Sequence, residues 1–465
     1  MTCLSSSLVR MRAALIAGTV ASVALLGAGV TTSAAQAQTT GTAGTAGTAA
    51  GSGWTAEKLP LLRGYTEDTA LPEANTIGCA SGKCVTAVSF NGTYGGELVV
   101  GSGSSWRAIV PPAPSNAASG PGGADEQFAA AGCGDGRCVA VGNYYAKSGS
   151  GLLAETGKGT SWKPYELPDR TGEASLARVA CADKCAAIST NSVYYRAELE
   201  LGSGTSWKAT VAPVPSNASS DPNVTLTSVA CGGKTCVATG GYYTKAGGED
   251  GLLEVTTGST WKAVSVALPG MRAADQDVAL PDIACVASGT CTTIGVSGGV
   301  IPGSAFITGS GTHWTMTKIP LKRGDSLLTS YGLYMACASA TTCTAVSEYV
   351  GSGGFANGVI AVKSGKTVKL AAIPALGKGT VLVAPIACLS AKLCAFAGTY
   401  EAKSGAGEPM LVTGAGTKWK ARELPEPKGA PKNLAAEPVW LACPRACDIV
   451  GIYDGDAPYL SAGPA

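Results

Sequence analysis

Short runs of alternating hydrophobic and polar residues, each bounded by a turn, repeat along most of the chain. One unit contains four such runs: Leu226 to Cys231, Cys236 to Tyr242, Gly251 to Val255 and Lys262 to Pro269. Alternation of this kind between turn residues predicts β-strands. No segment has a convincing helical period. We therefore expect an all-β fold built from units of four short strands.

Cysteine pairs set the period of this pattern. Apart from Cys3, the 17 cysteines form eight local pairs, and the first members of successive pairs lie 48 to 55 residues apart. Four antiparallel strands repeated about every 50 residues are typical of a β-propeller blade, so we expect eight blades. The pairs are Cys79 with Cys84, Cys133 with Cys138, Cys181 with Cys185, Cys231 with Cys236, Cys285 with Cys291, Cys337 with Cys343, Cys388 with Cys394, and Cys443 with Cys447.

The two ends of the repeat region are complementary. Residues Trp54 to Pro60 carry only a fourth-strand pattern, and the last unit, from Val439 to about Leu460, carries only strands one to three. Pairing these pieces would remove two exposed sheet edges. An open solenoid, the alternative, leaves the incomplete units unexplained. We expect an eight-bladed β-propeller whose ring is closed by the N-terminal strand completing the last blade.

Each cysteine pair flanks the turn between the first and second strands of a unit. Facing residues of an antiparallel hairpin are close enough for a disulfide bond. Metal binding is the alternative, but pairs spread around a ring cannot converge on one ion. We therefore expect eight disulfides, no metal site and no cofactor.

One residue recurs at the start of the fourth strands. It is tryptophan in seven units and Val368 in the eighth. A tryptophan repeated at one position indicates packing between adjacent sheets; a stacking platform for sugars is the alternative. The fourth strands are expected to start at Trp54, Trp106, Trp162, Trp207, Trp261, Trp314, Val368 and Trp419.

The N-terminus has the features of an export signal. Arg10 and Arg12 precede an apolar stretch from Ala13 to Val30, and Ala35-Gln36-Ala37 is a small-x-small cleavage site. A membrane anchor is the alternative, and no later stretch could span a bilayer. We expect a signal peptide at 1–37, a flexible Gly/Thr/Ala-rich linker at 38–52, and the propeller at 53–465. The protein is then secreted and extracellular.

Charge narrows the range of partners. Lys plus Arg total 34 and Asp plus Glu total 32, whereas a nucleic-acid-binding protein needs a basic surface. No nucleic acid is therefore expected as a partner.

The turns before the fourth strands resemble a known motif. Gly202-Ser-Gly-Thr-Ser-Trp207 is similar to the Asp-box of sialidase-like propellers, although glycine stands where that box has aspartate. Gly240-Gly241-Tyr242 and the following tryptophan resemble a kelch repeat. The pattern Cys-x4-5-Cys-x-Ala-Val-Gly-x-Tyr…Trp, nearly intact at Val139 to Tyr144, resembles secreted bacterial Cys-hairpin propeller repeats. These resemblances imply a propeller and no particular activity.

Loops after the second strands carry the candidate binding residues. In a propeller these loops share one face with long connections such as Pro111 to Ala124 and Pro213 to Asn223. Tyrosine, with an apolar ring and a polar tip, suits a glycan or protein ligand. In a tyrosine pair, the first ring can pack between blades, and the second points to the opposite side. The candidates are Tyr144, Tyr145, Lys147, Tyr195, Arg196, Tyr242, Tyr243, Lys245, Tyr349, Tyr400, Lys403 and Tyr453.

Catalytic chemistry finds little support. The chain has one histidine, His313, which excludes most histidine-based catalytic and metal sites. His313 occupies a turn position that is serine in other units, so we interpret it as an exposed turn residue. No sialidase-type arginine triad can be assigned. Paired carboxylates could hydrolyse glycosides, but the pairs here lie in polar loops and are interpreted as solvated surface. These pairs are Glu249-Asp250, Asp275 with Asp277, and Asp454 with Asp456.

Three functions remain open. We favour a secreted, monomeric, non-catalytic binding propeller that recognises an extracellular glycan or protein on the tyrosine-lined face. The alternatives are an extracellular carbohydrate-active enzyme (hydrolase or lyase) and a structural envelope or matrix component. Catalysis needs unlike residues that converge from neighbouring blades, whereas these loops hold mostly like residues, which favours binding.

Overall fold

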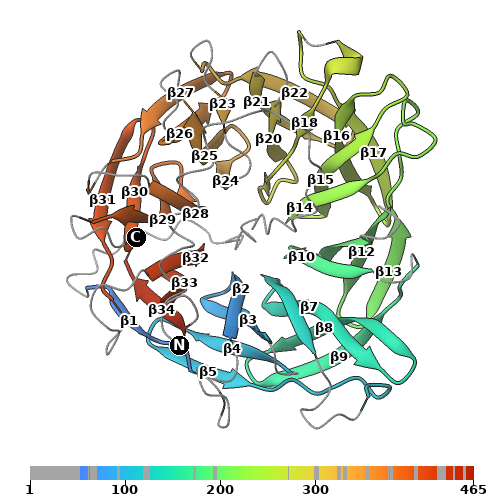
Figure 1. Cartoon of the computed structure of the whole chain (residues 1–465). Coiled ribbons are helices and arrows are strands. Elements are labelled where there is room, and N and C mark those ends of the chain that lie inside the picture. Colours follow the sequence, from blue (N-terminus) through green and yellow to red (C-terminus); the bar gives the residue numbers. More distant parts are fainter. Residues whose placement is uncertain are drawn as a thin grey trace, which may run out of the picture. The chain divides into compact units, whose positions relative to one another are not determined.

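Eight antiparallel sheets follow one another around a ring, as a computed structural model of the chain shows (Figure 1). They belong to the compact unit Thr31–Ala465. The predicted signal peptide and linker lie outside the described residues and stay predictions. The structure describes residues 53–60, 62, 71–91, 95–118, 126–170, 174–191, 196–270, 272–297, 303–321, 326–327, 332–350, 356–374, 376–377, 381–402, 407–426, 436–443, 446–453 and 457–464.

The sheets are the blades, and each has its first strand innermost. Blades 1 and 2 contain β2 to β9: Leu71–Ala80, Lys83–Asn91, Gly96–Ser102, Ser105–Ile109, Gln127–Gly134, Arg137–Ala146, Gly149–Lys158 and Ser161–Leu167. Blades 3 and 4 contain β10 to β17: Ser175–Cys181, Cys185–Asn191, Arg196–Ser203, Ser206–Val211, Thr225–Gly232, Thr235–Tyr243, Glu249–Thr257 and Thr260–Val266.

The second half of the ring is built in the same way. Blades 5 and 6 contain β18 to β27: Val278–Ala279, Ile283–Cys285, Cys291–Ser297, Gly303–Ser310, His313–Lys318, Ser326–Leu327, Leu333–Ser339, Thr342–Val350, Ala356–Ser364 and Thr367–Ala372. Blades 7 and 8 contain β28 to β34 and β1: Val381–Ser390, Leu393–Glu401, Gly407–Ala415, Lys418–Glu423, Ala436–Ala442, Cys447–Tyr453, Ala457–Gly463 and Thr55–Lys58.

The N-terminal strand closes the ring, as predicted. β1 is the outer strand of the sheet β32-β33-β34-β1, and it pairs with β34 from Thr55 opposite Ala462 to Lys58 opposite Tyr459. Figure 1 shows the two ends of the propeller side by side in this blade. The blade is therefore assembled from segments at opposite ends of the propeller sequence.

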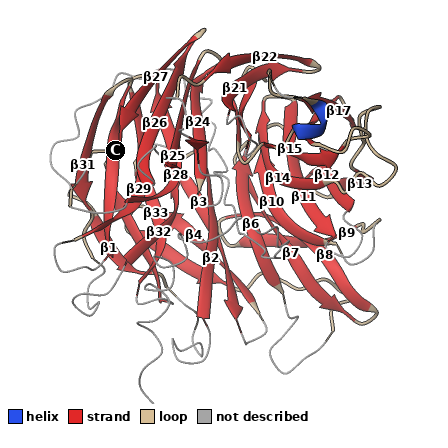
Figure 2. Cartoon of the chain, turned by 45° about the horizontal axis from the view of Figure 1, so that its top comes forward, coloured by secondary structure: helices blue, strands red, loops and turns tan. Residues whose placement is uncertain are grey.

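The first strand of several blades is less regular than its sequence pattern suggests. In blade 5 it is divided into β18 and β19 around Pro281, which has no N–H to donate to a ladder. Register shifts interrupt the pairing of β2, β6, β10 and β14 with the next strand, shortly before the first cysteine of each blade. Such bulges increase the local twist. The one helix among the described residues is a short 3-10 helix, η1 (Ala273–Asp275), between blades 4 and 5 (Figure 2).

All eight predicted disulfides are present. The paired Cα atoms lie 3.9 to 4.0 Å apart, and each bridge spans the turn between the first two strands of its blade. The bonds join Cys79 to Cys84, Cys133 to Cys138, Cys181 to Cys185, Cys231 to Cys236, Cys285 to Cys291, Cys337 to Cys343, Cys388 to Cys394, and Cys443 to Cys447.

These bridges stabilise the ring blade by blade. Closing a loop of about six residues is worth roughly 2 kcal/mol in the chain-entropy model. In blades 2, 6 and 7 the second cysteine is the second residue of the second strand, and it faces the first cysteine across the ladder. These cysteines are Cys138, Cys343 and Cys394. Eight such loops support a core that is poor in large aromatic side chains.

We expect no thiol of the mature protein to react when it is denatured without reductant. After reduction, the sixteen cysteines that follow the predicted signal should all react. Maleimide labelling followed by intact-mass measurement counts them. Labelling of eight or more thiols before reduction would contradict the pairing.

Each tryptophan packs between its own blade and the preceding one, as predicted. Trp162 belongs to the apolar cluster that joins blades 1 and 2, and Trp261 to the cluster that joins blades 3 and 4. Val368 takes this position at the junction of blades 5 and 6. The glycine at the aspartate position of the Asp-box has a steric cause. A Cβ on Gly202 would overlap the Trp207 ring, so the indole occupies the space that an aspartate would need.

Candidate functional site

The two faces of the ring carry different connections. Because strands alternate in direction within each blade, the cysteine-flanked and tryptophan-bearing turns lie on one face, called here the turn face. The loops between second and third strands lie on the other face, called here the loop face, together with the connections between blades. Those predicted binding residues that the structure describes belong to the loop face.

A proline-rich connector lies on the end of β7 in blade 2. Its backbone brackets the tyrosine pair, since Ala118 N donates to Tyr145 O over 2.8 Å and Lys147 N donates to Asn116 O over 3.0 Å. The Asn116 side chain continues the contact. It accepts from the Tyr144 hydroxyl over 3.0 Å and donates to Glu166 over 2.9 Å.

Blade 4 repeats this arrangement. Ser219 N donates to Tyr243 O and Lys245 N donates to Asn217 O, each over 2.9 Å. The Asn217 side chain accepts from the Tyr242 hydroxyl over 2.8 Å and donates to Asp250 over 3.1 Å. The sequence Pro-x-Pro-Ser-Asn-Ala occurs in both connectors, at 112–117 and 213–218. These two segments are called here the Pro-Ser-Asn connectors.

The first tyrosine of each pair, and the single Tyr400, are buried and pack within the blades, as expected for a first ring; their part in ligand binding stays a prediction. Tyr144 and Tyr242 are 1 % and 0 % exposed, and Tyr400 is 4 % exposed. Burial raises the pKa of all three hydroxyls. Tyr400 donates toward Glu408 and Glu423 over 2.6 and 2.9 Å. The rings fill space inside the blades, and their hydroxyls anchor connectors and outer strands.

The second tyrosine of each pair is exposed. Tyr145 is 48 % and Tyr243 is 44 % exposed, because adjacent residues on a strand point to opposite sides. Lys147 and Lys245, two residues further on, are also exposed. Lys245 donates from Nζ to the Ser216 carbonyl over 2.8 Å, so its charge is held beside the connector.

Sequence reasoning missed the apolar residues that accompany these tyrosines. Val110 and Val211 occupy the same position before the two connectors and are 64 % and 41 % exposed. Val214, inside the second connector, is 45 % exposed. The repeated Pro-x-Pro-Ser-Asn sequence was the signal that could have identified both sites.

The remaining predicted residues are placed only in part. Arg196 begins β12 and is exposed. Tyr195 and Lys403 lie outside the described residues. Tyr349 is the last residue but one of β25, and Tyr453 is the last residue of β33, but their side chains are not described. Their roles stay predictions.

The carboxylate pairs do not all lie on a solvated surface. Asp250 is 6 % exposed and accepts from Asn217, Tyr242 and Ser265, so it holds the connector in place. This corrects its interpretation as a solvated loop residue. Glu249 faces Asp277, and burial, followed by that neighbouring charge, raises the pKa of Glu249. The pair Asp454 and Asp456 lies outside the described part of the chain.

In the described part of the chain, one group of potential metal ligands occurs at the junction of blades 8 and 1. Cys79, Cys84 and Asp448 bring their ligand atoms within 4.8 Å of one another. The two sulfurs already form a disulfide, and Asp448 accepts from Gly103 N over 3.1 Å. A disulfide offers no thiolate, so this group does not have the donors that a metal ion requires.

Comparisons with known proteins find similarity in structure alone. No family model and no curated protein matches the sequence. YCF48 from Cyanidioschyzon merolae matches over 74 % of this chain and 96 % of its own, at 12 % identity and a TM-score of 0.40. The β-propeller domain of the Trilobed protease from Pyrococcus furiosus matches over 72 % and 94 %, at 8 % identity and a TM-score of 0.44.

A sialidase is also similar. Trypanosoma rangeli sialidase in complex with sialic acid matches over 65 % of this chain and 55 % of its own, at 11 % identity and a TM-score of 0.36. At these identities the comparisons concern the propeller fold only and assign no activity. Among the described residues, no helix has the length and hydrophobicity needed to span a membrane.

Proposed function

We propose that this protein is a secreted, non-catalytic binding propeller that recognises an extracellular glycan or protein on its loop face. The observation that carries the proposal is the duplicated site on blades 2 and 4. In each, a Pro-Ser-Asn connector holds a buried tyrosine through its asparagine while the next tyrosine stays exposed. The disulfides fit the oxidising compartment that secretion implies.

The chemistry of the two sites suits weak, repeated contacts. An exposed tyrosine offers a flat apolar ring and a hydroxyl at a low entropy cost. The exposed valines before and within the connectors add apolar surface to the same face, and a lysine adds a donor. Two such sites on one rigid ring raise the affinity for a repetitive ligand by avidity. Their residues are alike rather than complementary, which supports binding over catalysis.

The test is retention of the purified mature protein on insoluble polysaccharides and intact bacterial cell walls. Tyr145→Ala or Tyr243→Ala alone should weaken retention about tenfold, and the double variant should lose it almost completely, because avidity needs both sites. Melting temperatures should change little, since about half of each tyrosine is exposed to solvent.

Met316→Ala is the matched control, because Met316 is an exposed apolar residue on the outer strand of blade 5. It should leave retention unchanged. Intact retention of the double tyrosine variant would show that the loop face is the wrong site. Release of reducing or unsaturated sugars into the supernatant would favour the carbohydrate-active enzyme instead.

A further inference from the structure

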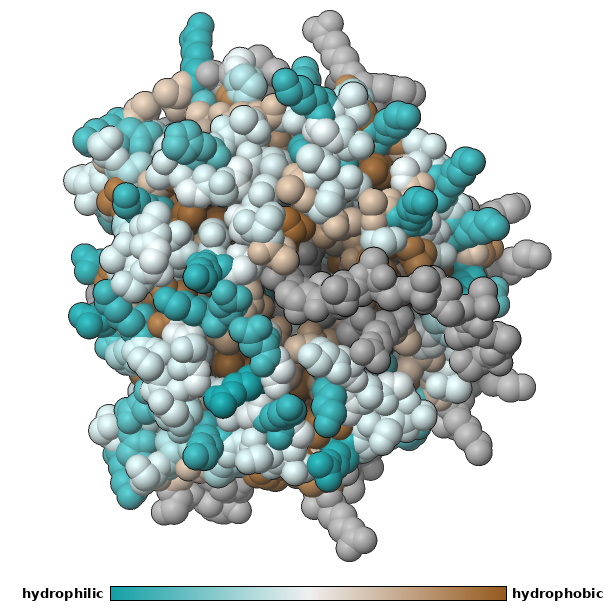
Figure 3. Space-filling view, turned by 180° about the vertical axis from the view of Figure 1, so that it is seen from behind, coloured by the Kyte–Doolittle hydropathy of each residue, from teal (hydrophilic) through white to brown (hydrophobic). Residues whose placement is uncertain are grey.

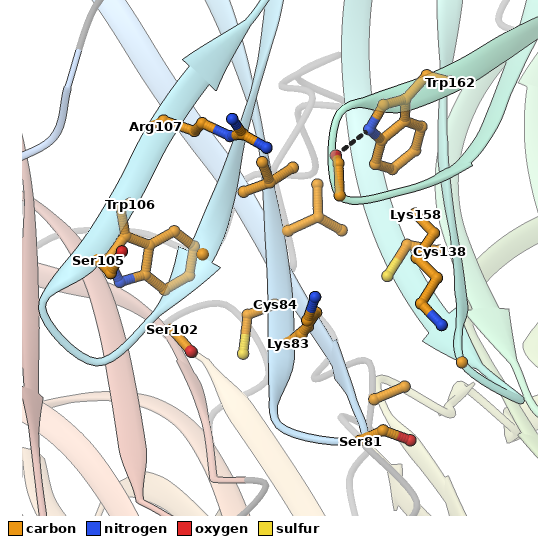
Figure 4. Close-up of a pocket in the computed structure, with 16 residues that line it drawn as sticks. Ser81, Lys83, Cys84, Ser102, Ser105, Trp106, Arg107, Cys138, Lys158 and Trp162 are labelled. Atoms are coloured by element: carbon orange, nitrogen blue, oxygen red, sulfur yellow. Dashed lines mark hydrogen bonds between the residues drawn. The ribbon is translucent and has the colours of Figure 1, made fainter.

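A cleft of about 540 Å³ lies between blades 1 and 2 on the turn face, opposite the tyrosine sites. It is formed by both turns of blade 1 and by the corresponding turns of blade 2. Val85 and Val100, and Trp162 in the opposite wall, line it but are only 1 %, 7 % and 6 % exposed, whereas the lining Trp106 of blade 1 is half-buried and leaves part of its indole open. The Trp162 indole is held by donation to the Gly159 carbonyl over 2.8 Å, so this wall is rigid (Figure 4). The volume is in the range of small-molecule sites, about 300–1,000 Å³.

Three cations line this cleft. Lys83 comes from the cysteine turn of blade 1, Arg107 from β5 and Lys158 from the end of β8. All three are exposed, and none of their side chains makes a hydrogen bond or ion pair with another described residue. Figure 4 shows Arg107 extending from blade 1 toward the turn that carries Trp162. Serine hydroxyls from the same turns complete the lining.

Among the described residues, no carboxylate lines the cleft. Asp135, in the turn beside Gly136, is exposed but is not a lining residue. Asp448 lies behind Cys84, where it is 2 % exposed and already accepts from Gly103 N. The lining itself therefore supplies positive charge without a neutralising partner. On the face seen in Figure 3, hydrophilic side chains are dispersed among less polar ones.

The junction between blades 3 and 4 shows that this opening is not a consequence of the repeat alone. There the cysteine turns of the two blades are joined, because Asp183 N donates to Gly233 O over 3.3 Å. No such bond joins the described turns of blades 1 and 2. Lys184 and Lys208 occupy the positions of Lys83 and Arg107, but the third cation is replaced by Thr257.

We propose that the cleft binds an acidic polysaccharide, with one sugar unit that carries a carboxylate seated between blades 1 and 2. The apolar face of a sugar ring can pack on the open part of the Trp106 indole, and the serines can bond its hydroxyls. Arginine binds a carboxylate through two parallel hydrogen bonds, and lysine adds a point charge. The site is independent of the loop face, so either can fail without the other.

Polygalacturonate is the probe, measured by calorimetry against the intact mature protein. Lys83→Gln combined with Arg107→Gln should lower its affinity at least about tenfold, the loss expected for charge-assisted hydrogen bonds. Lys184→Gln combined with Lys208→Gln removes the same charge from equivalent positions of blade 3 and should leave the affinity unchanged. The fully methyl-esterified polymer, which lacks the negative charge, should not bind. Tyr145→Ala with Tyr243→Ala should have no effect on polygalacturonate.

Equal losses in the two charge variants would mean nonspecific attraction of a polyanion and would overturn the proposal. The proposal would also be overturned if the wild type did not bind polygalacturonate at low salt, or if the esterified polymer bound as tightly as polygalacturonate. All four substituted side chains are exposed, so the variants should fold, and matched melting temperatures verify this.

Discussion

Removal of residues 53–60 should lower the stability of the mature protein by about 5 kcal/mol or more and convert it into an aggregation-prone species. This segment supplies the outer strand of blade 8, so its loss removes four ladder pairs with β34. It also removes Leu59, which is 3 % exposed in the cluster that joins blades 8 and 1. A fully buried leucine side chain contributes about 1.5–3 kcal/mol, and the half-buried Trp54 adds to this.

Trp54 gives the N-terminal segment contacts beyond its strand pairing with β34. Its indole donates to the Pro464 carbonyl over 2.8 Å, lies against Gly463, and is covered by the Arg422 guanidinium of blade 7 at 5.3 Å. The segment therefore joins the C-terminus to the preceding blade as well as completing its own. Without it, β34 becomes an unprotected edge, which is a template for association with another chain.

Thermal unfolding and size-exclusion chromatography measure both effects. A chain that begins at residue 53 is the control, because it lacks only the predicted linker and should keep the melting temperature of the mature protein. A synthetic peptide of residues 53–60 added to the shorter chain should restore part of the lost stability. If the chain that begins at residue 61 had the same melting temperature as the control, ring closure by this strand would be contradicted.

The sequence was sufficient for the architecture because its signals repeat. One cysteine pair and one tryptophan per unit established the blade count, and the incomplete units at the two ends predicted the closure. Val368 fits the same position because a smaller apolar side chain can still fill a junction. The bulges in the inner strands were not predictable, since they depend on twist near the ring centre rather than on hydrophobic alternation.

The sites were less predictable because they are assembled between units. The alternation rule placed Tyr145 and Tyr243 on the exposed side, but it could not show that a connector brackets them. The cleft between blades 1 and 2 requires side chains from four turns whose separation is set by blade packing. Buried carboxyls were also missed, because a glutamate in an alternating run is ordinarily assigned to the solvent side.

Three of these carboxyls occupy one repeated position on the third strand. Glu155, Glu200 and Glu254 each precede by two residues the residue that pairs with a tryptophan. All three are 0 % exposed, and within the described part of the chain neither oxygen of any of them has a hydrogen-bond partner. Burial raises their pKa values from 4.5 to about 9, 8 and 9.

Neighbouring charges add to this effect of burial. The negative charge of Glu126 raises the pKa of Glu155 further. Glu198 and Asp169 act in the same direction on Glu200, and Arg170 opposes them. For Glu254, burial is the cause. The three carboxyls are thus protonated in the folded protein at neutral pH.

The pH dependence follows from the sign of these shifts. In the unfolded chain the carboxyls ionise near pH 4.5, whereas in the folded protein they stay protonated up to about pH 8–9. Their contribution to stability is fully present below pH 4.5 and is lost as the pH rises through the folded values. Each site then loses up to roughly 4 kcal/mol between about pH 5 and pH 8, at about 1.4 kcal/mol per pH unit.

The protein should therefore melt at a lower temperature at pH 8 than at pH 5, the reverse of ordinary acid denaturation. Replacing Glu155, Glu200 and Glu254 together by glutamine should raise the melting temperature at pH 8 and change it little at pH 5, because glutamine has the shape of the protonated acid and cannot ionise. The control replaces the exposed Glu57, Glu401 and Glu426 by glutamine, which should leave the pH profile as it was. If the buried triple variant kept the wild-type slope, these carboxyls would not be the groups that make folding sensitive to alkali. A flattened slope would instead mean that three buried carboxyls at one repeated position, rather than the surface as a whole, set the pH range in which the ring is stable.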